Sequence, residues 1–251
     1  VDQPSLNLAL GEFDGGDNYY DWAVMGYFGR INYNYADKYF LEVNGRYDGS
    51  SSFAEGDRFV FLPSASAGWN IANESFLESA EKLSLLKLRA SWGEIGNQLV
   101  RTNGSRDYYP YIAGYEAYNP YWIDRSLNMR YTSFNPAQLV SGGFTWERVQ
   151  TSNVGLDFGF FDGRLDGSID LYKRKTIGML SAGIQLPATL GTEAPKQNIA
   201  DLEVKGWELE LGWNDRVGKV NYGINFNLSN NSGEITKFLN EGMLISNYYV
   251  G

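Results

Sequence analysis

Two pairs of carboxylates are the residues whose types and spacing come nearest to a catalytic arrangement. Glu208 and Glu210 are two residues apart, and Asp166 and Asp170 are four apart. Alternate residues of a strand share a face, which places Glu208 and Glu210 about 6–7 Å apart. Glycosidases use two carboxylates at a short separation to cleave sugar chains. Because acidic residues on a wet strand face are far commoner than catalytic pairs, we expect no catalytic residue and no enzyme here.

The composition removes most other site chemistry. The 251 residues include no Cys and no His, so thiolate chemistry, imidazole bases and the usual transition-metal ligands are excluded. The acidic stretch 14–18 (D-G-G-D-N) offers oxygen ligands for Ca²⁺ but lacks the EF-hand spacing, and we interpret it as a turn. A net charge of −9 argues against a nucleic-acid partner. We expect no metal and no cofactor.

The strongest structural pattern is the alternation between Tyr39 and Asp48. Leu41 and Val43 occupy one phase, and charged or amide side chains occupy the other. Side chains of a strand point to opposite faces at every second residue, so this segment is a strand with one apolar and one polar face.

The same alternation predicts about eight strands, each about twice the usual length in globular proteins. A tilted strand of about 10–13 residues spans roughly 25 Å, the height of the apolar band of an outer-membrane barrel. The fold class that this predicts is all-β, an antiparallel transmembrane β-barrel segment. The expected strands cover residues 22–35, 39–48, 59–71, 84–95, 145–161, 164–176, 203–214 and 219–230.

The connections differ in length between the two ends of the strands. Short turns are expected at 36–38, 162–163 and 215–218, with a compact link that includes a helical turn at 72–83. The longer connections are 49–58, 96–144 and 177–202. Short turns at one edge and long loops at the other are typical of outer-membrane barrels. A soluble β-sandwich that binds carbohydrate outside the cell remains the alternative, because alternation alone is compatible with both.

The two phases predict the environment of individual side chains. In a barrel, the apolar phase faces lipid and the polar phase faces a wet lumen. The residues expected to face lipid are Tyr27, Ile31, Tyr33, Leu41, Val43, Leu88, Trp92, Leu156, Phe158, Ile169, Leu209, Leu211, Ile224 and Phe226. The residues expected to face the lumen are Arg30, Asn32, Glu42, Asn44, Arg46, Asp48, Lys87, Arg89, Asp157, Asp170, Glu208 and Glu210.

Seven segments of the chain together form a recognisable series. They are Y-F-G-R-I-N-Y-N-Y-A-D-K-Y (27–39), R-Y-D-G-S-S-S-F (46–53), F-L-P-S-A-S-A-G-W (61–69), L-K-L-R-A-S-W-G-E-I-G-N (86–97), W-E-R-V-Q-T-S-N-V-G-L-D-F (146–158), L-P-A-T-L-G (186–191) and N-I-A-D-L-E-V-K-G-W-E-L-E-L (198–211). In order and spacing, these segments resemble the SusC/RagA-like TonB-linked outer-membrane transporter family of Bacteroidetes. One departure is S-G-G-F (141–144), where the family often has Asn-Pro shortly before Trp-Glu, so we make no prediction for the conformation of that loop end.

The resemblance implies a fold and a set of partners. It implies an integral outer-membrane protein whose 22-stranded barrel is closed by a plug, covered by a SusD-like surface lipoprotein and driven by TonB through the plug. Such proteins import oligosaccharides or peptides. We expect residues 1–251 to form part of one such barrel domain, with the plug and the barrel ends absent from this chain.

Two groups of residues are candidates for contacts outside the barrel wall. Aromatic rings in the 96–144 connection suit stacking on sugar rings or docking a lid protein, or they fold the loop on itself. With Asp162-Gly163 on the periplasmic side, Arg148, Lys173 and Lys205 lie near the extracellular edge, where they would meet lipopolysaccharide phosphates or extend to the rim. The loop aromatics are Tyr108, Tyr109, Tyr111, Tyr115, Tyr118, Tyr121 and Trp122.

Overall fold

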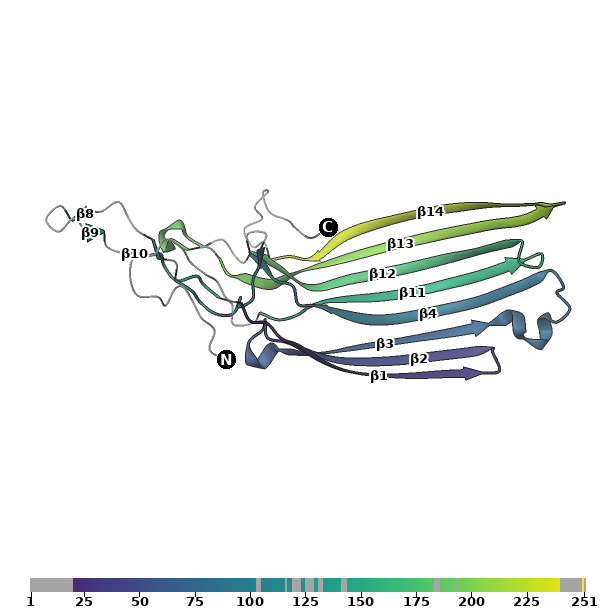
Figure 1. The fold of residues 1–251 in the computed structure, drawn as a ribbon, viewed down its shortest axis with the longest axis horizontal. Helices are drawn as coiled ribbons and strands as arrows, with labels where there is room; N and C mark the ends of the chain where they lie inside the picture. The colour runs from purple at the N-terminus through teal and green to yellow at the C-terminus, as the bar shows by residue number, and fades with distance from the viewer. Residues whose placement is uncertain are drawn as a thin grey trace.

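The protein forms a single eight-stranded antiparallel sheet (Figure 1). The computed structural model describes residues 20–102, 105–115, 117–118, 123–124, 129–130, 133–140, 144–182, 186–192, 194–239 and 250. The strands follow one another in chain order across the sheet, as β1-β2-β3-β4-β11-β12-β13-β14, and each pairs antiparallel with its neighbours. The predicted all-β fold class is confirmed.

The long strands are connected by short turns at one end and by longer connections at the other. In Figure 1 the turns lie at the right, and the short elements β5–β10 and η5 lie at the left. The long strands are β1 (Val24–Tyr35), β2 (Tyr39–Ser50), β3 (Phe59–Asn70), β4 (Leu83–Asn97), β11 (Glu147–Phe160), β12 (Leu165–Ala182), β13 (Lys196–Val217) and β14 (Val220–Lys237).

Short elements occupy the connections. The described parts of the long connection after β4 hold three two-stranded ribbons, β5–β6, β7–β10 and β8–β9. The 3-10 turns are η2 (Glu55–Asp57), η3 (Ile71–Asn73), η4 (Ser75–Leu77) and η5 (Ala188–Leu190). The ribbon strands are β5 (Arg101–Thr102), β6 (Ser105–Arg106), β7 (Ala117–Tyr118), β8 (Ile123–Asp124), β9 (Met129–Arg130) and β10 (Ser133–Phe134).

The pairing register sorts the side chains into an apolar face and a polar face. Every residue that the sequence assigns to lipid lies in the apolar phase, and every residue assigned to a lumen lies in the polar phase. One hydrogen-bonded row of the apolar face contains Tyr33, Leu41, Ala67, Ala90, Val154, Leu171 and Trp207. The next row along the strands contains Asn34, Phe40, Gly68, Arg89, Gly155, Asp170 and Glu208 and belongs to the polar face.

The described sheet is one layer thick, and its apolar face is uncovered. Ile31 is 73% exposed, Ile224 is 66% exposed and Leu171 is 59% exposed. A β-sandwich buries such residues against a second sheet, and none packs here among the described residues. A contiguous apolar surface of this extent requires a covering, which a lipid bilayer supplies. The β-sandwich alternative is therefore not supported.

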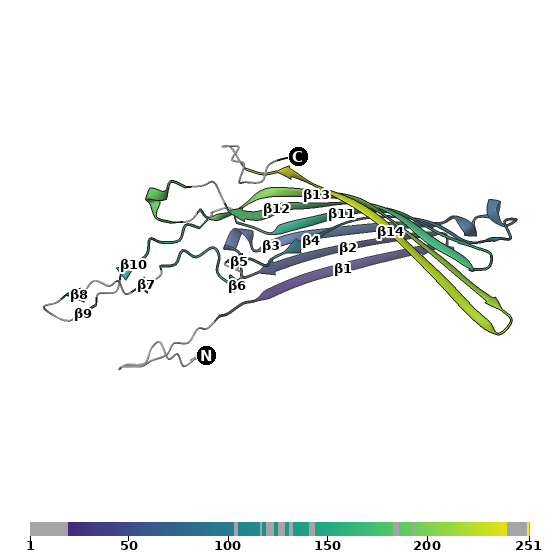
Figure 2. The same cartoon turned by 90° about the horizontal axis from the view of Figure 1, so that it is seen from above.

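The positions of the turns give the tilt of the strands. The β1–β2 turn joins Tyr35 to Tyr39, and the row through these residues reaches Leu209 in β13. The β13–β14 turn lies about eight residues further along β13, at Val217, and about six strand-to-strand steps separate the two hairpins. If the turns lie in one plane, the strands tilt by about 40°, within the range of outer-membrane barrels. Figure 2 shows the corresponding curvature, with the β13–β14 hairpin turned away from β1 and β2.

A small hydrophobic core sits where the long connections meet the sheet. Phe53, Val100, Phe144 and Trp146 are buried together, and the rings of Phe53 and Trp146 lie 5.1 Å apart. The indole Nε1 of Trp146 donates to the carbonyl of Arg58 at 3.0 Å. This cluster ties the β2–β3 connection to both ends of the β4–β11 connection, at the end of the sheet opposite the turns.

The predicted boundaries need three corrections. The connection expected at 177–202 is shorter, because β12 continues to Ala182 and β13 begins at Lys196. The turn expected at 215–218 lies at 218–219, and the last strand continues to Lys237 instead of ending near 230. The predicted Asp162-Gly163 turn is confirmed, with φ of 58° and 81° at its two central residues. In the part of the chain that is described, no helix has the length and apolarity to cross a bilayer.

Candidate functional site

The polar face of the sheet carries a network of ion pairs between neighbouring strands and along them. On β1 and β2, Arg30 pairs with Glu42, and Arg46 Nη2 lies 3.1 Å from Asp48 Oδ2. Cations and carboxylates therefore alternate across this part of the wall. Because each pair is largely exposed, each contributes at most about 1 kcal/mol to stability.

Arg89 of β4 is the central cation of the polar face. Its Nε and Nη2 donate to the two carboxylate oxygens of Asp157 in β11, both at 2.8 Å. The same Nη2 donates to Asp170 Oδ2 in β12 at 3.0 Å. A planar guanidinium suits this two-pronged contact, which a lysine cannot reproduce. One side chain thus links three strands.

The bridge from Arg89 to Asp170 requires the glycine between them. Gly155 of β11 lies in the same row, and a Cβ there would be 2.5 Å from Asp170 Oδ1 and 2.7 Å from Arg89 Nη2. Neither distance is compatible with a side chain. The absence of a Cβ at Gly155 is therefore what allows Arg89 to reach across β11.

A shallow hollow of about 420 Å³ lies on the polar face beside Arg89. Its polar lining comes from β1 to β4 and from Asn153 of β11, and it includes Asn32, Glu42 and Lys87. The Lys87 ammonium lies 4.7 Å from the centre of the Phe40 ring, a cation–π contact. This part of the wall presents donors, acceptors and one aromatic face to whatever fills the space in front of it.

The carboxylates of β12 and β13 lie on the same polar face. Glu208 is opposite Asp170 in the register, and Glu210 is opposite Ser168. Asp170 is held by Arg89, whereas Glu208 and Glu210 are exposed and have no ion pair among the described residues. They give this part of the wall an acidic surface. The 14–18 stretch lies outside the described residues, and no group that could hold a metal occurs among those that are described.

Two of the predicted loop aromatics pack against the segment that leads into β1. The Tyr109 hydroxyl donates to the carbonyl of Asp21 at 2.8 Å and accepts from its N–H at 2.9 Å. The Tyr108 ring stacks on Tyr20 at 5.1 Å. The sequence pattern does not predict these partners, because 88 residues separate Asp21 from Tyr109. Tyr108 and Tyr109 therefore fix the loop to the wall.

Arg106, two residues before Tyr108, completes this aromatic cluster and joins it to Trp22. The Arg106 guanidinium lies 4.2 Å from the Trp22 ring centre and 5.1 Å from that of Tyr108. Of the other predicted aromatics, Tyr111 is half-buried and Tyr115 is 70% exposed. Tyr121 and Trp122, and the side chain of Tyr118, lie outside the described residues. Tyr115 is thus the described loop aromatic with the most free surface.

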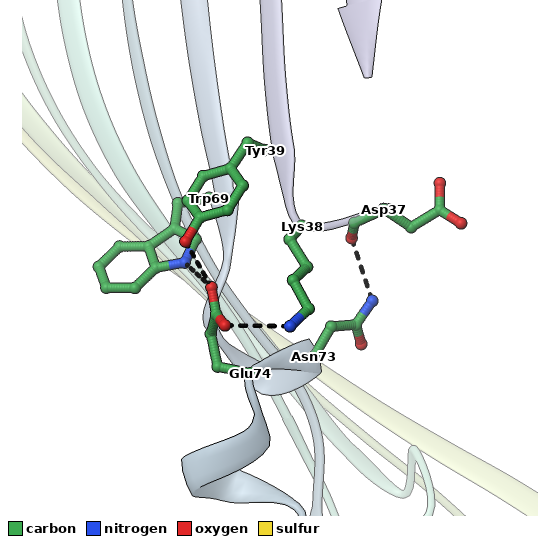
Figure 3. Close-up of polar contacts among 6 residues, drawn as sticks. All are labelled: Asp37, Lys38, Tyr39, Trp69, Asn73 and Glu74. Atoms are coloured by element: carbon green, nitrogen blue, oxygen red, sulfur yellow. Dashed lines mark hydrogen bonds and ion pairs between the residues drawn. The ribbon is translucent and has the colours of Figure 1, made fainter. Parts of the chain in front are cut away.

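At the opposite end of the sheet, Glu74 collects the polar tips of three side chains (Figure 3). The Tyr39 hydroxyl donates to Glu74 Oε1 at 2.7 Å, and the Trp69 indole donates to the same oxygen at 3.0 Å. Lys38 Nζ lies 3.1 Å from Oε2. The side-chain amide of Asn73 donates a hydrogen bond to the carbonyl of Asp37 and so ties the link between η3 and η4 to the β1–β2 turn. The cluster fixes the two aromatic rings at the edge of the apolar face, the depth at which Tyr and Trp favour a membrane interface.

The contacts around Glu74 also shift its acidity. The hydrogen bonds from Tyr39, then Trp69, then Lys38 favour the carboxylate and lower the Glu74 pKa to about 2. Glu74 lies in the link between η3 and η4, beyond the ends of the strands. It therefore stays charged throughout the physiological range and is a permanent anchor for the turn.

Comparison with known proteins assigns this geometry to a class. The model of the family described as "TonB dependent receptor-like, beta-barrel" matches residues 2–247. The TonB-dependent receptor SusC of Bacteroides thetaiotaomicron is 35% identical over 229 residues, covering 90% of this chain and 22% of SusC. The TonB-dependent receptor P26 of Formosa agariphila is 32% identical over 237 residues, covering 92% and 22%. The structure of the RagAB peptide importer in its closed-closed state superposes with a TM-score of 0.73 at 26% identity, covering 96% of this chain and 26% of that one.

These findings agree with the single sheet, its uncovered apolar face and the tilt of its strands. The fold is that of a section of an outer-membrane β-barrel receptor. The chain belongs to the TonB-dependent receptor-like β-barrel family, and its similarity to SusC and RagAB confirms the predicted SusC/RagA-like resemblance. Proteins of this family are integral to the outer membrane, as the sequence predicted. The chain spans about a fifth of the length of the curated relatives that it matches.

Replacing Arg89 with Met tests the central ion pairs of the polar face. We expect the free energy of unfolding of the complete protein to fall by about 1–2 kcal/mol, because Asp157 and Asp170 lose their shared donor. Urea unfolding from lipid vesicles measures this. Lys87→Met is the matched control on the same strand and face, since Lys87 contacts a ring and no carboxylate. Equal loss of stability in the two variants would contradict the role given to Arg89.

Replacing Glu74 with Gln tests the anchor at the turns. A carboxylate with a lowered pKa stabilises the folded state above the unfolded pKa, near 4.5, and this contribution is lost as the pH falls toward 2. We expect the variant to be less stable than the wild type at pH 7, with the difference shrinking below about pH 4.5. Thermal unfolding from pH 7 to pH 2 measures this. Glu78→Gln, in the same link, is the control; an equal pH dependence of the wild type and the Glu74 variant would exclude the anchor.

Proposed function

We propose that this chain is a section of the barrel wall of a TonB-dependent transporter that imports oligosaccharide or peptide nutrients. The observation that carries the proposal is the one-layer sheet, whose register separates an uncovered apolar face from a polar face over all eight strands. A wall of this construction is stable between lipid and a wet interior. We assign no catalytic role to this section of the wall.

The apolar face meets lipid in this proposal. The residues assigned to lipid in the sequence analysis form its rows, from Tyr27 and Ile31 on β1 to Ile224 and Phe226 on β14. Aromatic rings border the face at the turn end, where Tyr39 and Trp69 stack with centroids 6.4 Å apart. Their polar tips point to Glu74, outside the strands (Figure 3). The short turns then lie in the periplasm and the long connections outside the cell.

The polar face lines the lumen and meets a plug. The ion pairs around Arg89 hold the wall itself, while Glu208 and Glu210 offer unpaired carboxylates to basic groups of the plug or the cargo. The outer edges of β1 and β14 have backbone groups without partners in the described sheet, and further strands of a longer polypeptide satisfy them. We assign the sheet to a larger barrel of 22 strands, the size that the SusC/RagA-like resemblance implies. The plug, the barrel ends and TonB act outside residues 1–251.

Import uses partners that the relatives suggest. The matched RagAB structures are described as a peptide transporter and a peptide importer, and SusC is described as a TonB-dependent receptor. We assign to this protein a SusD-like surface lipoprotein that covers the lumen, and energy supplied by TonB through the plug. The loop after β4 lies at the mouth, where Tyr115 presents a ring for stacking on cargo or on the lid. We assign the same stacking role to Trp122, which lies outside the described residues.

Replacing Tyr115 and Trp122 with Ala in the complete transporter tests the loop assignment. We expect cargo uptake or the affinity for the lipoprotein to fall by about thirtyfold, because each lost ring removes roughly 1 kcal/mol of stacking and the two together remove about 2 kcal/mol. Uptake by whole cells and co-purification of the lipoprotein measure the two effects. Phe76→Ala is the control, since Phe76 is 65% exposed at the turn end. Unchanged uptake and unchanged lid binding would contradict the assignment.

A further inference from the structure

Three lysines converge on one carboxylate on the apolar face of the sheet. Lys173 Nζ lies 2.7 Å from Glu203 Oε1, and Lys205 Nζ lies 3.0 Å from the same oxygen. Lys175 Nζ lies 3.6 Å from Glu203 Oε2. The lysines come from two paired strands, with Lys173 opposite Lys205 and Lys175 opposite Glu203 in the register. The four residues form a compact unit, which we call the lysine cluster.

The lysine cluster lies at the boundary of the apolar band. Lys173 and Lys205 each occupy the next position on the apolar face after Leu171 and Trp207, at the end away from the short turns. If the proposed orientation of the barrel holds, this end faces the outside of the cell. The ammonium groups then lie at the depth of the head groups of the outer leaflet.

The exposure of the four side chains differs in a way that indicates a second anion. The Glu203 side chain is only 12% exposed, whereas those of Lys173, Lys175 and Lys205 are 42%, 47% and 63% exposed. The carboxylate therefore lies beneath the ammonium groups and holds them together. Each ammonium has three N–H donors and directs one of them toward the Glu203 carboxylate. The other donors therefore remain at the surface.

The charge of the cluster also favours an anion. Three cations share Glu203, and Glu234 of β14, opposite Glu203 in the register, is the other carboxylate that acts on Lys205. Three positive charges against two negative charges leave the group basic. Elsewhere on the same face, Arg148 lies 3.7 Å from Glu94, a neutral one-to-one pair. Rim ion pairing explains Arg148, but it leaves the excess of lysines around Glu203 unexplained.

We propose that Lys173, Lys175 and Lys205 form a binding site for the phosphate groups of lipopolysaccharide in the outer leaflet, with Glu203 as the residue that positions them. Clustered ammonium groups are suited to phosphate as point charges. The proposal rests on the orientation given by the proposed function. It adds a lipid site to a surface that the transport mechanism does not use.

The test compares binding of phosphorylated and dephosphorylated lipid A by the complete transporter. The lysine-to-Gln triple variant at positions 173, 175 and 205 is purified in detergent and titrated with mixed micelles containing each lipid. Arg174→Gln is the matched control, because Arg174 lies between two of the lysines in sequence but on the polar face. Arg148→Gln is a second control on the apolar face. Glu203→Gln removes the internal anion while keeping the three cations.

We expect the triple variant to bind phosphorylated lipid A at least about tenfold more weakly, since one Lys near an anionic surface contributes roughly fivefold. Both arginine controls should bind like the wild type. E203Q should bind more weakly than the arginine controls but more tightly than the triple variant, because the three cations remain and lose the carboxylate that holds them together. Three results would each overturn the proposal. They are binding of phosphorylated lipid A by the triple variant as tightly as by the wild type, binding of dephosphorylated lipid A by the wild type as tightly as phosphorylated lipid A, and displacement of bound lipid A by millimolar inorganic phosphate. Heat-modifiable migration and cargo uptake are measured on the same proteins. If the wild type shows neither heat-modifiable migration nor cargo uptake, the proposed function is contradicted. If the wild type shows both and the triple variant binds phosphorylated lipid A as the wild type does, only the lipid site is overturned.

Discussion

The need to pair every backbone N–H and C=O group inside a bilayer is the constraint on which this structure depends. No water is available in the hydrocarbon layer, so a chain of strands survives there only as an unbroken ladder. The register pairs every strand of the sheet, from β1 to β14, with its neighbours, and β11 pairs along nearly its whole length with both β4 and β12. The pairing of β3 with β4 is shorter and covers Ser64 to Asn70. The irregularities of register lie toward the strand ends, at Gly159/Phe160, Thr176/Met179, Met179/Leu180 and Asp201/Leu202.

The same register determines which side chains lie on each face of the sheet. A slip of one residue in any pair would move a whole set of side chains to the opposite face, so the apolar rows also enforce the pairing. On the polar face, Arg89 lies flat across Gly155 to reach Asp170, an arrangement that holds only in this register. At each end of the apolar face a carboxylate gathers polar tips: Glu74 near the turns and Glu203 near the long connections. The edges of the wall are thus defined by residues that hold neighbouring side chains in place.

The sequence predicts the strands and their faces well where a single period of two applies. From Leu41 to Asp48 the polar phase holds only charged or amide side chains, whereas Leu41, Val43 and Tyr47 occupy the other phase. The Asp162-Gly163 turn likewise has residues that tolerate a positive φ. The ends of β12 and β13 were missed because both faces are mixed beyond Lys175 and before Glu203, which removes the alternation. The contact of Tyr109 with Asp21 and the convergence on Glu74 depend on residues distant in sequence. Periodicity carries no information about such contacts.

In this wall, alternate residues of one strand face lipid and water. The chain contains no Cys, so single cysteines at Leu41, Glu42, Val43 and Asn44 give unique labelling sites within it. In the complete protein, with any other cysteines replaced, each variant is reconstituted in bilayers and labelled with a fluorophore. Labels at positions 41 and 43 should be quenched by brominated lipid chains and protected from aqueous quenchers, and labels at 42 and 44 should show the reverse. Equal quenching at all four positions, or water access to 41 and 43, would contradict the account.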